Sequence, residues 1–189
     1  MLVLAGPSGV GKGTVGRALL ARDDTLAWSV SATTRAPRPG ETNGVDYHFV
    51  TREQFERLRD SDGFLEWFEV YGQLKGTPRQ WVEDRLAAGG DVLLEIDVQG
   101  AVAVRERYRD ALLIFLRAPN PTVQAQRLRE RGSDDPAQVA RRLETAAAEE
   151  ALAERFDAVV INDDLDQAVA EVAAILGARR AGPPPDGFS

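Results

Sequence analysis

A glycine-rich loop with a single lysine lies close to the start of the chain, Gly6-Pro-Ser-Gly-Val-Gly11-Lys12-Gly13-Thr14. It follows an apolar run that predicts a buried strand over 2–5, and it opens a segment with helical spacing over 12–21. Glycines let backbone N–H groups converge on phosphate oxygens, the helix N-terminus adds positive potential, and a lysine reaches the terminal phosphates of a nucleotide. The sequence therefore predicts a phosphate-binding loop, made of Gly6, Pro7, Ser8, Gly9, Val10, Gly11, Lys12, Gly13 and Thr14.

The residue after Lys12 departs from the general pattern of such loops. It is Gly13, where many of them carry a Ser or Thr that binds Mg²⁺. Thr14 follows, and the sequence leaves open whether it is a direct ligand or whether phosphates and water hold the ion. The loop alone indicates a nucleotide and does not distinguish a kinase from a GTPase or an ATPase.

Two arginines and a tyrosine form a second group that can bind phosphate. Arg35 and Arg38 lie in a segment rich in proline and glycine, and Tyr47 follows it. Arginine binds a phosphate monoester through two parallel hydrogen bonds, and tyrosine adds a hydroxyl donor. From the residues alone, a solvated basic loop explains the segment equally well.

The elements around these groups alternate. Strands are predicted over 2–5, 26–31, 47–50, 64–70, 91–96, 111–116 and 157–161, and helices over 12–21, 51–58, 77–88, 98–107, 121–131, 136–154 and 165–179. Alternation of this kind predicts an α/β three-layer sandwich with a central parallel sheet. In detail, Thr77 is predicted to cap a helix that has Pro78 in its first turn. His48 is predicted to be structural or exposed, and Trp28, Trp67 and Trp81 to lie in the core.

Composition excludes several classes of protein. The 189 residues fit one domain, the formal net charge is -7, and there is no cysteine. An acidic chain is a poor general binder of nucleic acid or anionic membrane, no disulfide framework can form, and no apolar run reaches the ~18 residues of a membrane span. The N-terminus does not resemble a signal peptide, so a cytoplasmic protein is expected. The oligomeric state is left open.

A longer segment around the two arginines resembles a known family. Residues 31–50, Ser-Ala-Thr-Thr-Arg-Ala-Pro-Arg-Pro-Gly-Glu-Thr-Asn-Gly-Val-Asp-Tyr-His-Phe-Val, are similar to the GMP-binding signature of guanylate kinases, among the nucleoside monophosphate kinases. The resemblance extends to about Leu176 through Phe64-Leu-Glu-Trp67, Leu94-Glu-Ile-Asp-Val-Gln-Gly100, Arg131-Gly132, Arg141-Arg-Leu143 and Ile161-Asn-Asp-Asp-Leu165. It implies an enzyme that uses ATP, with Mg²⁺, to phosphorylate GMP and, we expect, dGMP.

The resemblance also implies roles for single residues. Arg35, Arg38 and Tyr47 match positions that hold the GMP phosphate, and Ser31 and Glu66 match positions that bind guanine. Thr77 matches a small hydroxyl residue near them, and Glu95 and Asp97 match acidic positions that face GMP and the metal. On the ATP side, Arg131 and Arg142 match lid arginines and Asn162 a residue near adenine. The residues expected to act directly in phosphoryl transfer are Lys12, Arg35, Arg131 and Arg142.

The resemblance further divides the chain into subregions. The core is expected over 1–29, 81–119 and 151–180, a small inserted α/β GMP-binding domain over 30–80, a helical lid over 120–150, and a flexible tail over 181–189. The short strands and polar loops of 30–80 agree with an insertion, because they interrupt the alternation of longer elements.

Two points stay open at this stage. The family usually has a tyrosine before the Gly-Thr of a second phosphate-contacting turn, and Lys75 stands there, either as a replacing charge or pointing to solvent. A non-catalytic guanylate kinase-like domain that binds phosphorylated partners is the alternative function. Such domains typically lose the loop lysine or the lid arginines, which this chain keeps.

Overall fold

The central layer of the protein is a five-stranded parallel sheet, seen in a computed structural model that describes residues 1–70, 72–130 and 136–182. Its strand order is β2-β7-β1-β8-β9, and every neighbouring pair is parallel. The strands are β1 (Leu2–Ala5), β2 (Leu26–Trp28), β7 (Asp91–Glu95), β8 (Leu112–Arg117) and β9 (Ala158–Ile161). Parallel strands end at the same edge, so the segments that follow β1, β7 and β9 meet there.

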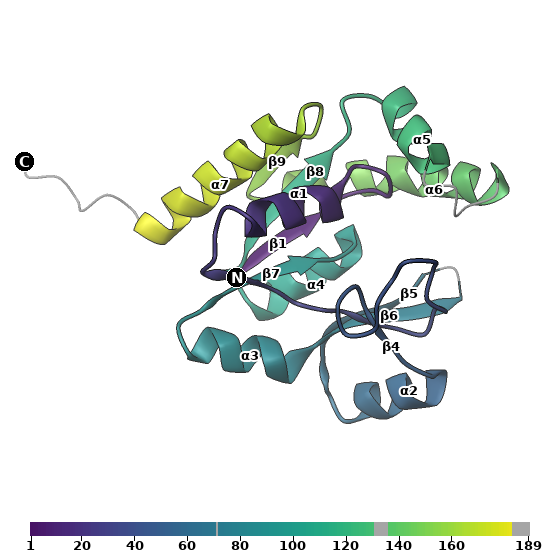
Figure 1. Ribbon diagram of the computed structural model, residues 1–189, viewed down its shortest axis with the longest axis vertical. Helices are drawn as coiled ribbons and strands as arrows, with labels where there is room; N and C mark the ends of the chain where they lie inside the picture. Colours follow the sequence, from purple (N-terminus) through teal and green to yellow (C-terminus); the bar gives the residue numbers. More distant parts are fainter. Residues whose placement is uncertain (71, 131–135, 183–189) are drawn as a thin grey trace, which may run out of the picture.

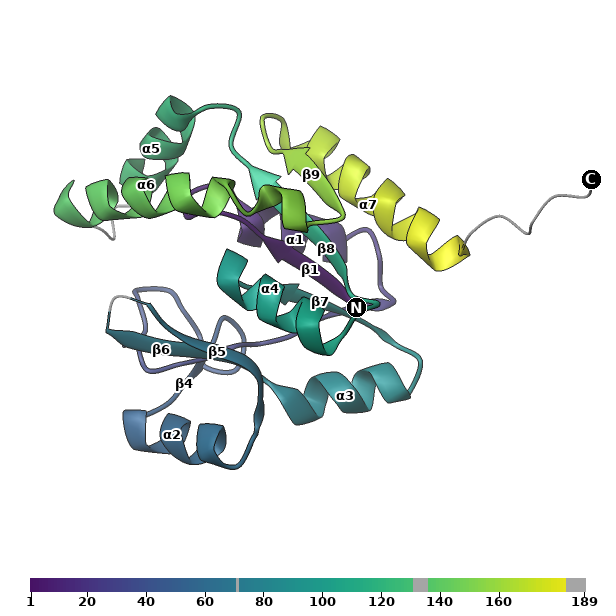
Figure 2. The same cartoon turned by 180° about the vertical axis from the view of Figure 1, so that it is seen from behind.

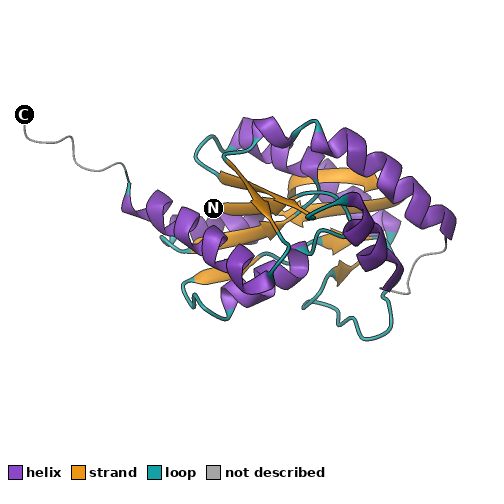
Figure 3. Ribbon diagram, turned by 90° about the horizontal axis from the view of Figure 1, so that it is seen from above, coloured by secondary structure: helices purple, strands orange, loops and turns teal. Residues whose placement is uncertain are grey.

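Helices cover both faces of this sheet, because side chains alternate along each buried strand. Leu2 and Leu4 face α1 (Lys12–Leu20) and α7 (Leu165–Ala181), whereas Val3 and Ala5 face α3 (Arg79–Ala87) and α4 (Val98–Arg107). Figures 1 and 3 show these layers. The predicted α/β sandwich with a central parallel sheet is therefore confirmed.

A second, smaller sheet lies beside the first and has its own core. It has the order β4-β3-β6-β5, from β3 (Ala32–Thr33), β4 (His48–Phe49), β5 (Phe64–Val70) and β6 (Gln73–Pro78). Helix α2 (Arg52–Asp60) begins with a capping box between Thr51 and Gln54 and buries Phe55. The Phe55 and Phe64 rings stack at 4.3 Å, packed with Ala32 and Leu74.

Two further helices complete the edge where the parallel strands end. Helices α5 (Pro121–Glu130) and α6 (Pro136–Glu150) follow β8, and a short 3₁₀ turn, η1 (Ala153–Arg155), leads into β9. Figures 1 and 2 show the α5–α6 pair and the smaller sheet on opposite sides of that edge. Phosphate loop, smaller sheet and helical pair are thus brought to one end of the molecule.

Several local predictions are wrong. The predicted strand over 26–31 is too long, because β2 ends at Trp28 and residues 29–31 lead out of the main sheet to β3 in the smaller one. Helix α3 begins at Arg79, and Thr77 lies in β6 instead of capping it, because its hydroxyl binds a buried carboxylate. Trp67 and Trp81 are 41% and 46% exposed, and only Trp28 packs against the main core.

The remaining local predictions concern His48, the C-terminal tail and membrane-spanning helices. His48 is exposed, as expected. The predicted tail over 181–189 lies, from residue 183 on, outside the described residues. Within the part of the chain that the structure describes, no helix is long and apolar enough to cross a lipid bilayer.

Because the smaller sheet has a core of its own, Phe55→Ala should destabilise the protein by roughly 3–5 kcal/mol. The expected readout is a lower midpoint of urea unfolding. Arg57→Ala is the matched control on the same helix, since its exposed pair with Glu53 contributes little, and it should change stability by less than about 1 kcal/mol. Equal effects of the two substitutions would contradict a separate core.

Candidate active site

The loop between β1 and α1 is held by close contacts that only glycine permits. Gly6, Gly9 and Gly11 all have positive φ, at 146°, 86° and 93°. A Cβ at Gly6 would lie 2.1 Å from the Leu116 carbonyl oxygen, and one at Gly11 2.4 Å from Asn162 Nδ2. The loop is therefore pressed against β8 on one side and the segment after β9 on the other.

Lys12 is folded back over its own loop. Its Nζ donates to the carbonyl oxygens of Gly6 at 2.6 Å and Pro7 at 3.1 Å. Burial lowers the pKa of the Lys12 ammonium, and the negative charges of Glu95 and Glu149 oppose that shift. Among the described residues these carbonyl oxygens are the hydrogen-bond partners of Lys12, and the ammonium can exchange them for phosphate oxygens when a nucleotide binds.

Gly13 lies close against the side chain of Glu95. A Cβ at this position would lie 3.2 Å from Glu95 Oε2 and 3.4 Å from Oε1. Glu95 ends β7, whose register against β1 pairs Leu4 with Glu95, so the carboxylate lies beside the phosphate loop. A hydroxyl side chain at residue 13 would compete with this carboxylate for space. Thr14, the other open candidate, is exposed at the start of α1.

The arginine segment is ordered by one acidic residue. Glu41 accepts two hydrogen bonds from the Arg35 guanidinium, at 2.8 and 2.9 Å, and a third from the Arg38 backbone N–H at 2.7 Å. These bonds lower the pKa of Glu41, with the Arg35 hydrogen bond as the main cause. The Arg35 guanidinium lies 5.3 Å from the centre of the Tyr47 ring. Arg35 and Tyr47 are thus brought together, with Arg38 in the same turn.

Glu66 is a carboxylate with very little access to water. Its side chain points from β5 toward β6, where the Thr77 hydroxyl donates to Oε1 at 2.5 Å. Only 8% of the residue is exposed, and burial raises its pKa to about 7. Oε2 lies 3.1 Å from the place of a Cβ on Gly100 in α4. Glu66 therefore lies between the smaller sheet and the main domain.

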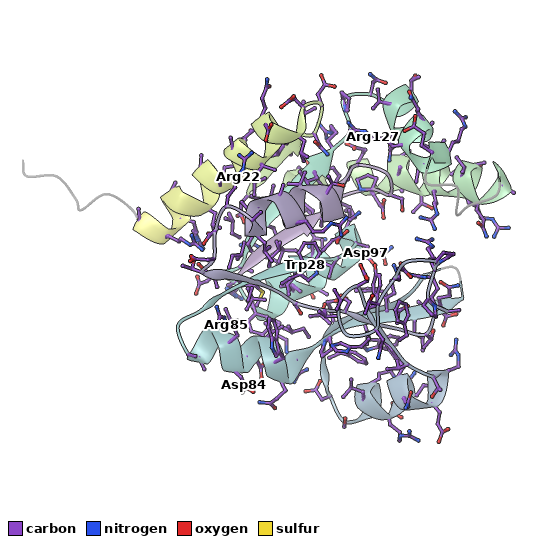
Figure 4. The ribbon with its side chains drawn as sticks, viewed as in Figure 1. Arg22, Trp28, Asp84, Arg85, Asp97 and Arg127 are labelled. Atoms are coloured by element: carbon purple, nitrogen blue, oxygen red, sulfur yellow. The ribbon has the colours of Figure 1, made fainter. Side chains whose placement is uncertain are left out.

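Asp97 connects the same region to the core. It caps α4 by accepting a hydrogen bond from Gly100 N–H at 2.8 Å, and its negative charge raises the pKa of Glu66 further. Figure 4 shows Asp97 at the side of the core that faces the smaller sheet. Ser31, another predicted guanine contact, is half-buried just before β3, and its carbonyl accepts from His48 N–H at 2.9 Å.

Helices α5 and α6 contact the phosphate loop from the other side. Arg142 Nη1 lies 3.5 Å from Ser8 Oγ, so this predicted lid arginine reaches the loop. Gln124 Nε2 donates to the Ser8 carbonyl at 2.8 Å. Arg131, the second predicted lid arginine, lies outside the described residues.

A cavity of about 290 Å³ adjoins the loop at the start of α1. Asn162, buried at its edge, donates from Nδ2 to the Val10 carbonyl at 2.8 Å, and Arg127 Nη1 donates to the Asn162 carbonyl at 2.9 Å. The walls comprise Gly9, Gly11, Thr14, Arg127, Asn162, Asp163 and Leu165. A cavity with amide and backbone groups beside a phosphate loop suits a nucleotide base.

Sequence reasoning missed four residues of this site. Glu41 orders Arg35, and Gln124 binds the Ser8 carbonyl. Arg127 lines the cavity, and the charge of Glu149 acts on Lys12. Burial raises the pKa of Glu149, and Lys12 opposes this shift. Gln124 and Arg127 stand three positions apart on α5, which is the spacing of one helix face. That spacing was visible in the sequence, but nothing there showed which face met the loop.

The pKa of Glu66 predicts a pH-dependent cost in stability. Between pH 4.5 and about 7 the unfolded chain is ionised at this residue while the folded chain holds the proton, so stability falls as pH rises. Above pH 7 the ionised Glu66 lowers the free energy of unfolding by the full amount, about 3 kcal/mol. In the absence of ligand, Glu66→Gln should therefore raise the free energy of unfolding at pH 8, and most of the gain should be gone at pH 5.

Glu69→Gln is the matched control for this measurement, because Glu69 lies in the same strand with an exposed side chain. Urea unfolding of the three proteins at both pH values gives the comparison. A Glu66→Gln variant that is less stable than the wild type at pH 8 would contradict the assigned cost.

Comparison with known proteins gives matches over almost the whole chain. The family model described as guanylate kinase matches residues 1–179. A guanylate kinase of Symbiobacterium thermophilum is 50% identical over 183 residues, which cover 96% of this chain and 86% of that protein. One from Thermus thermophilus is 52% identical over 180 residues, which cover 95% and 81%.

Solved structures give the same result. The crystal structure of guanylate kinase from Anaplasma phagocytophilum superposes with a TM-score of 0.78 at 36% identity, covering 98% of this chain and 87% of that one. Shikimate kinase from Bacteroides thetaiotaomicron, at a TM-score of 0.53 and 15% identity, covers 94% and 98% and shows the fold alone. With a matching family model and relatives at about half identity over nearly the full length of this chain, the protein belongs to the guanylate kinase family.

Proposed function

We propose that this protein transfers the γ-phosphoryl group of ATP to GMP. The observation that carries the proposal is Glu66, a carboxylate only 8% exposed and bound to Thr77, with a pKa raised by burial. A protein gains no stability by burying such a group, so a ligand that uses it explains its presence.

Guanine supplies the matching chemistry. Its N1–H and 2-amino group are adjacent donors, and one carboxylate accepts from both. Adenine lacks this pair of donors and would leave Glu66 desolvated and unpaired, which a site of this kind penalises by a factor of about 10⁴ or more. We place guanine against Glu66 and Thr77, with Ser31 and Asp97 nearby.

With guanine in that place, the phosphate of GMP would lie at the arginine segment. We assign it to Arg35, Arg38 and Tyr47, which Glu41 and the Arg35–Tyr47 contact already hold in one cluster. Burial raises the pKa of Tyr47, with a further contribution from Glu95, so its hydroxyl stays a donor at neutral pH. The GMP phosphate is an anionic nucleophile, and the transfer therefore needs alignment and charge neutralisation but no general base.

The donor nucleotide is assigned to the other side of the phosphate loop. We place its phosphates over Lys12 and the loop glycines, and adenine in the cavity beside Asn162 and Arg127. Arg142 already reaches Ser8, and together with Arg131 it would neutralise charge on the transferred group.

We further propose that residues 120–150 act as a lid and 30–80 as a mobile GMP-binding unit, joined to a core of 1–29, 81–119 and 151–180. Cations on both sides of the site repel one another until phosphates bind, so substrates would draw the two units together. Closure would exclude water, which otherwise accepts the phosphoryl group.

Mg²⁺ is proposed to enter with ATP. Among the described residues, no group of three His, Asp or Glu side chains could hold a metal ion by itself. Mg²⁺ keeps several waters and is usually bound through one or two carboxylates together with substrate phosphates, and Glu95 and Asp97 fit that donor set. When bound, the ion neutralises phosphate charge. The cytoplasmic location expected from the sequence stays a prediction.

The proposal is tested by mixing protein, ATP and Mg²⁺ with GMP, dGMP, AMP, CMP or UMP in turn and measuring ADP formation. Turnover with the guanine nucleotides alone is expected, because only guanine offers the donor pair to Glu66. GMP binding without turnover would favour a non-catalytic binding domain instead. Turnover with another base would show that Glu66 does not select the acceptor.

Glu66→Gln should lower kcat/KM for GMP by about 10² or more, since the amide presents one acceptor and one donor to two guanine donors. Its KM for ATP should stay within about twofold of wild type, because Glu66 lies on the acceptor side. The Glu69→Gln variant should keep both values. Equal losses toward ATP and GMP would contradict the assigned role.

A further inference from the structure

The side chains of β6 divide between two environments. Leu74 packs into the small core with Phe55 and Phe64, and Gly76 lies against Phe64 and Trp67. Lys75 and Thr77 alternate with them and therefore project from the opposite face of the sheet. Thr77 uses that face to contact Glu66, so Lys75 stands on the face that forms the acceptor site.

The ammonium group of Lys75 lies next to the arginine segment. Its Nζ is 5.3 Å from the centre of the Tyr47 ring, and the Arg35 guanidinium is also 5.3 Å from that centre. The side chain is half-buried and does not extend into solvent. Two cations thus lie beside one tyrosine ring, and their positive charges repel each other.

Arg35 and Lys75 differ in whether a carboxylate contacts them directly. Arg35 is paired with Glu41 through two hydrogen bonds. The Lys75 side chain, by contrast, makes no hydrogen bond or ion pair within the residues that the structure describes, and Asp97 and Glu95 act on its charge only from beyond ion-pair distance. Burial lowers the pKa of Lys75, the positive charge of Arg35 lowers it further, and the negative charges of Asp97 and Glu95 oppose the shift. A half-buried ammonium with no anion in direct contact is costly to the empty protein, and a bound anion would remove that cost.

We propose that Lys75 is a ligand of the acceptor's phosphate group, supplying a third cation beside Arg35 and Arg38. The inference rests on the proposed function and adds to it a residue specific to this chain, where the family usually has a tyrosine. A tyrosine offers one neutral hydroxyl donor, whereas an ammonium supplies full charge and up to three donors. Lys75 acts on the phosphate and not on the base, which Glu66 and Thr77 hold.

The test compares two ligands that differ only in that phosphate. Binding of GMP and of guanosine is measured by calorimetry for the wild type and for Lys75→Met, which keeps the length of the side chain and removes its charge. We expect the Kd for GMP to rise about 10- to 100-fold, as for loss of a charge-assisted contact. The Kd for guanosine should change less than about twofold. The four values form a cycle that isolates the coupling between Lys75 and the phosphate.

Arg57→Met is the matched control, because it removes an exposed cation from the same inserted unit and should alter neither Kd. The melting temperature of unliganded Lys75→Met gives a second readout, and it should equal or exceed that of the wild type, since an unpaired cation has been removed. A lower melting temperature, with GMP and guanosine weakened equally, would show a structural role and overturn the proposal. Unchanged GMP binding would also overturn it, while a wild type that binds no GMP would overturn the proposed function itself.

Discussion

The site depends on concentrating charge at one edge of a parallel sheet where little water enters. Strands β1 and β7 are neighbours, so the phosphate loop after one and the carboxylates after the other are forced together. Lys12, Glu95 and Asp97 influence one another for that reason. The same edge receives Arg142 from α6 and, across from it, the cations of the inserted segment. Phosphoryl transfer needs such an environment, because preorganised charges act more strongly where water is excluded.

This concentration of charge lowers the stability of the empty protein. Burial raises the pKa of Glu66 and lowers those of Lys12 and Lys75, so each of these three charges is less favourable in the folded chain than in water. Two sets of hydrogen bonds limit this loss of stability. Lys12 uses backbone carbonyls of its own loop as temporary acceptors, and Glu41 neutralises Arg35. Glu66 keeps one strong donor, Thr77. The groups left least satisfied are those that the proposed substrates would pair.

Separate hydrophobic cores allow these charges to be assembled from independent parts. The smaller sheet has its own stacked Phe55–Phe64 pair, and the main sheet is covered by helices on both faces. The acceptor side therefore belongs to a unit whose core is separate from the core that holds the phosphate loop, and we propose that this unit moves. In the proposed function, that freedom lets two anionic substrates approach each other only after both are bound.

The sequence by itself determined the main elements of the central layer and its helices, but not β3 and β6 of the smaller sheet. Periodicity located the five parallel strands and their helices, because burial on both faces leaves long apolar runs, and spacing identified the phosphate loop from Gly6 to Thr14. The family resemblance supplied Glu66, whose burial no local pattern predicts. Only the tertiary structure decided that Thr77 binds Glu66 instead of capping a helix, that Glu95 lies close against Gly13, and that Lys75 faces Tyr47. Each of these depends on contacts between different elements of the fold, and a local propensity cannot encode such contacts.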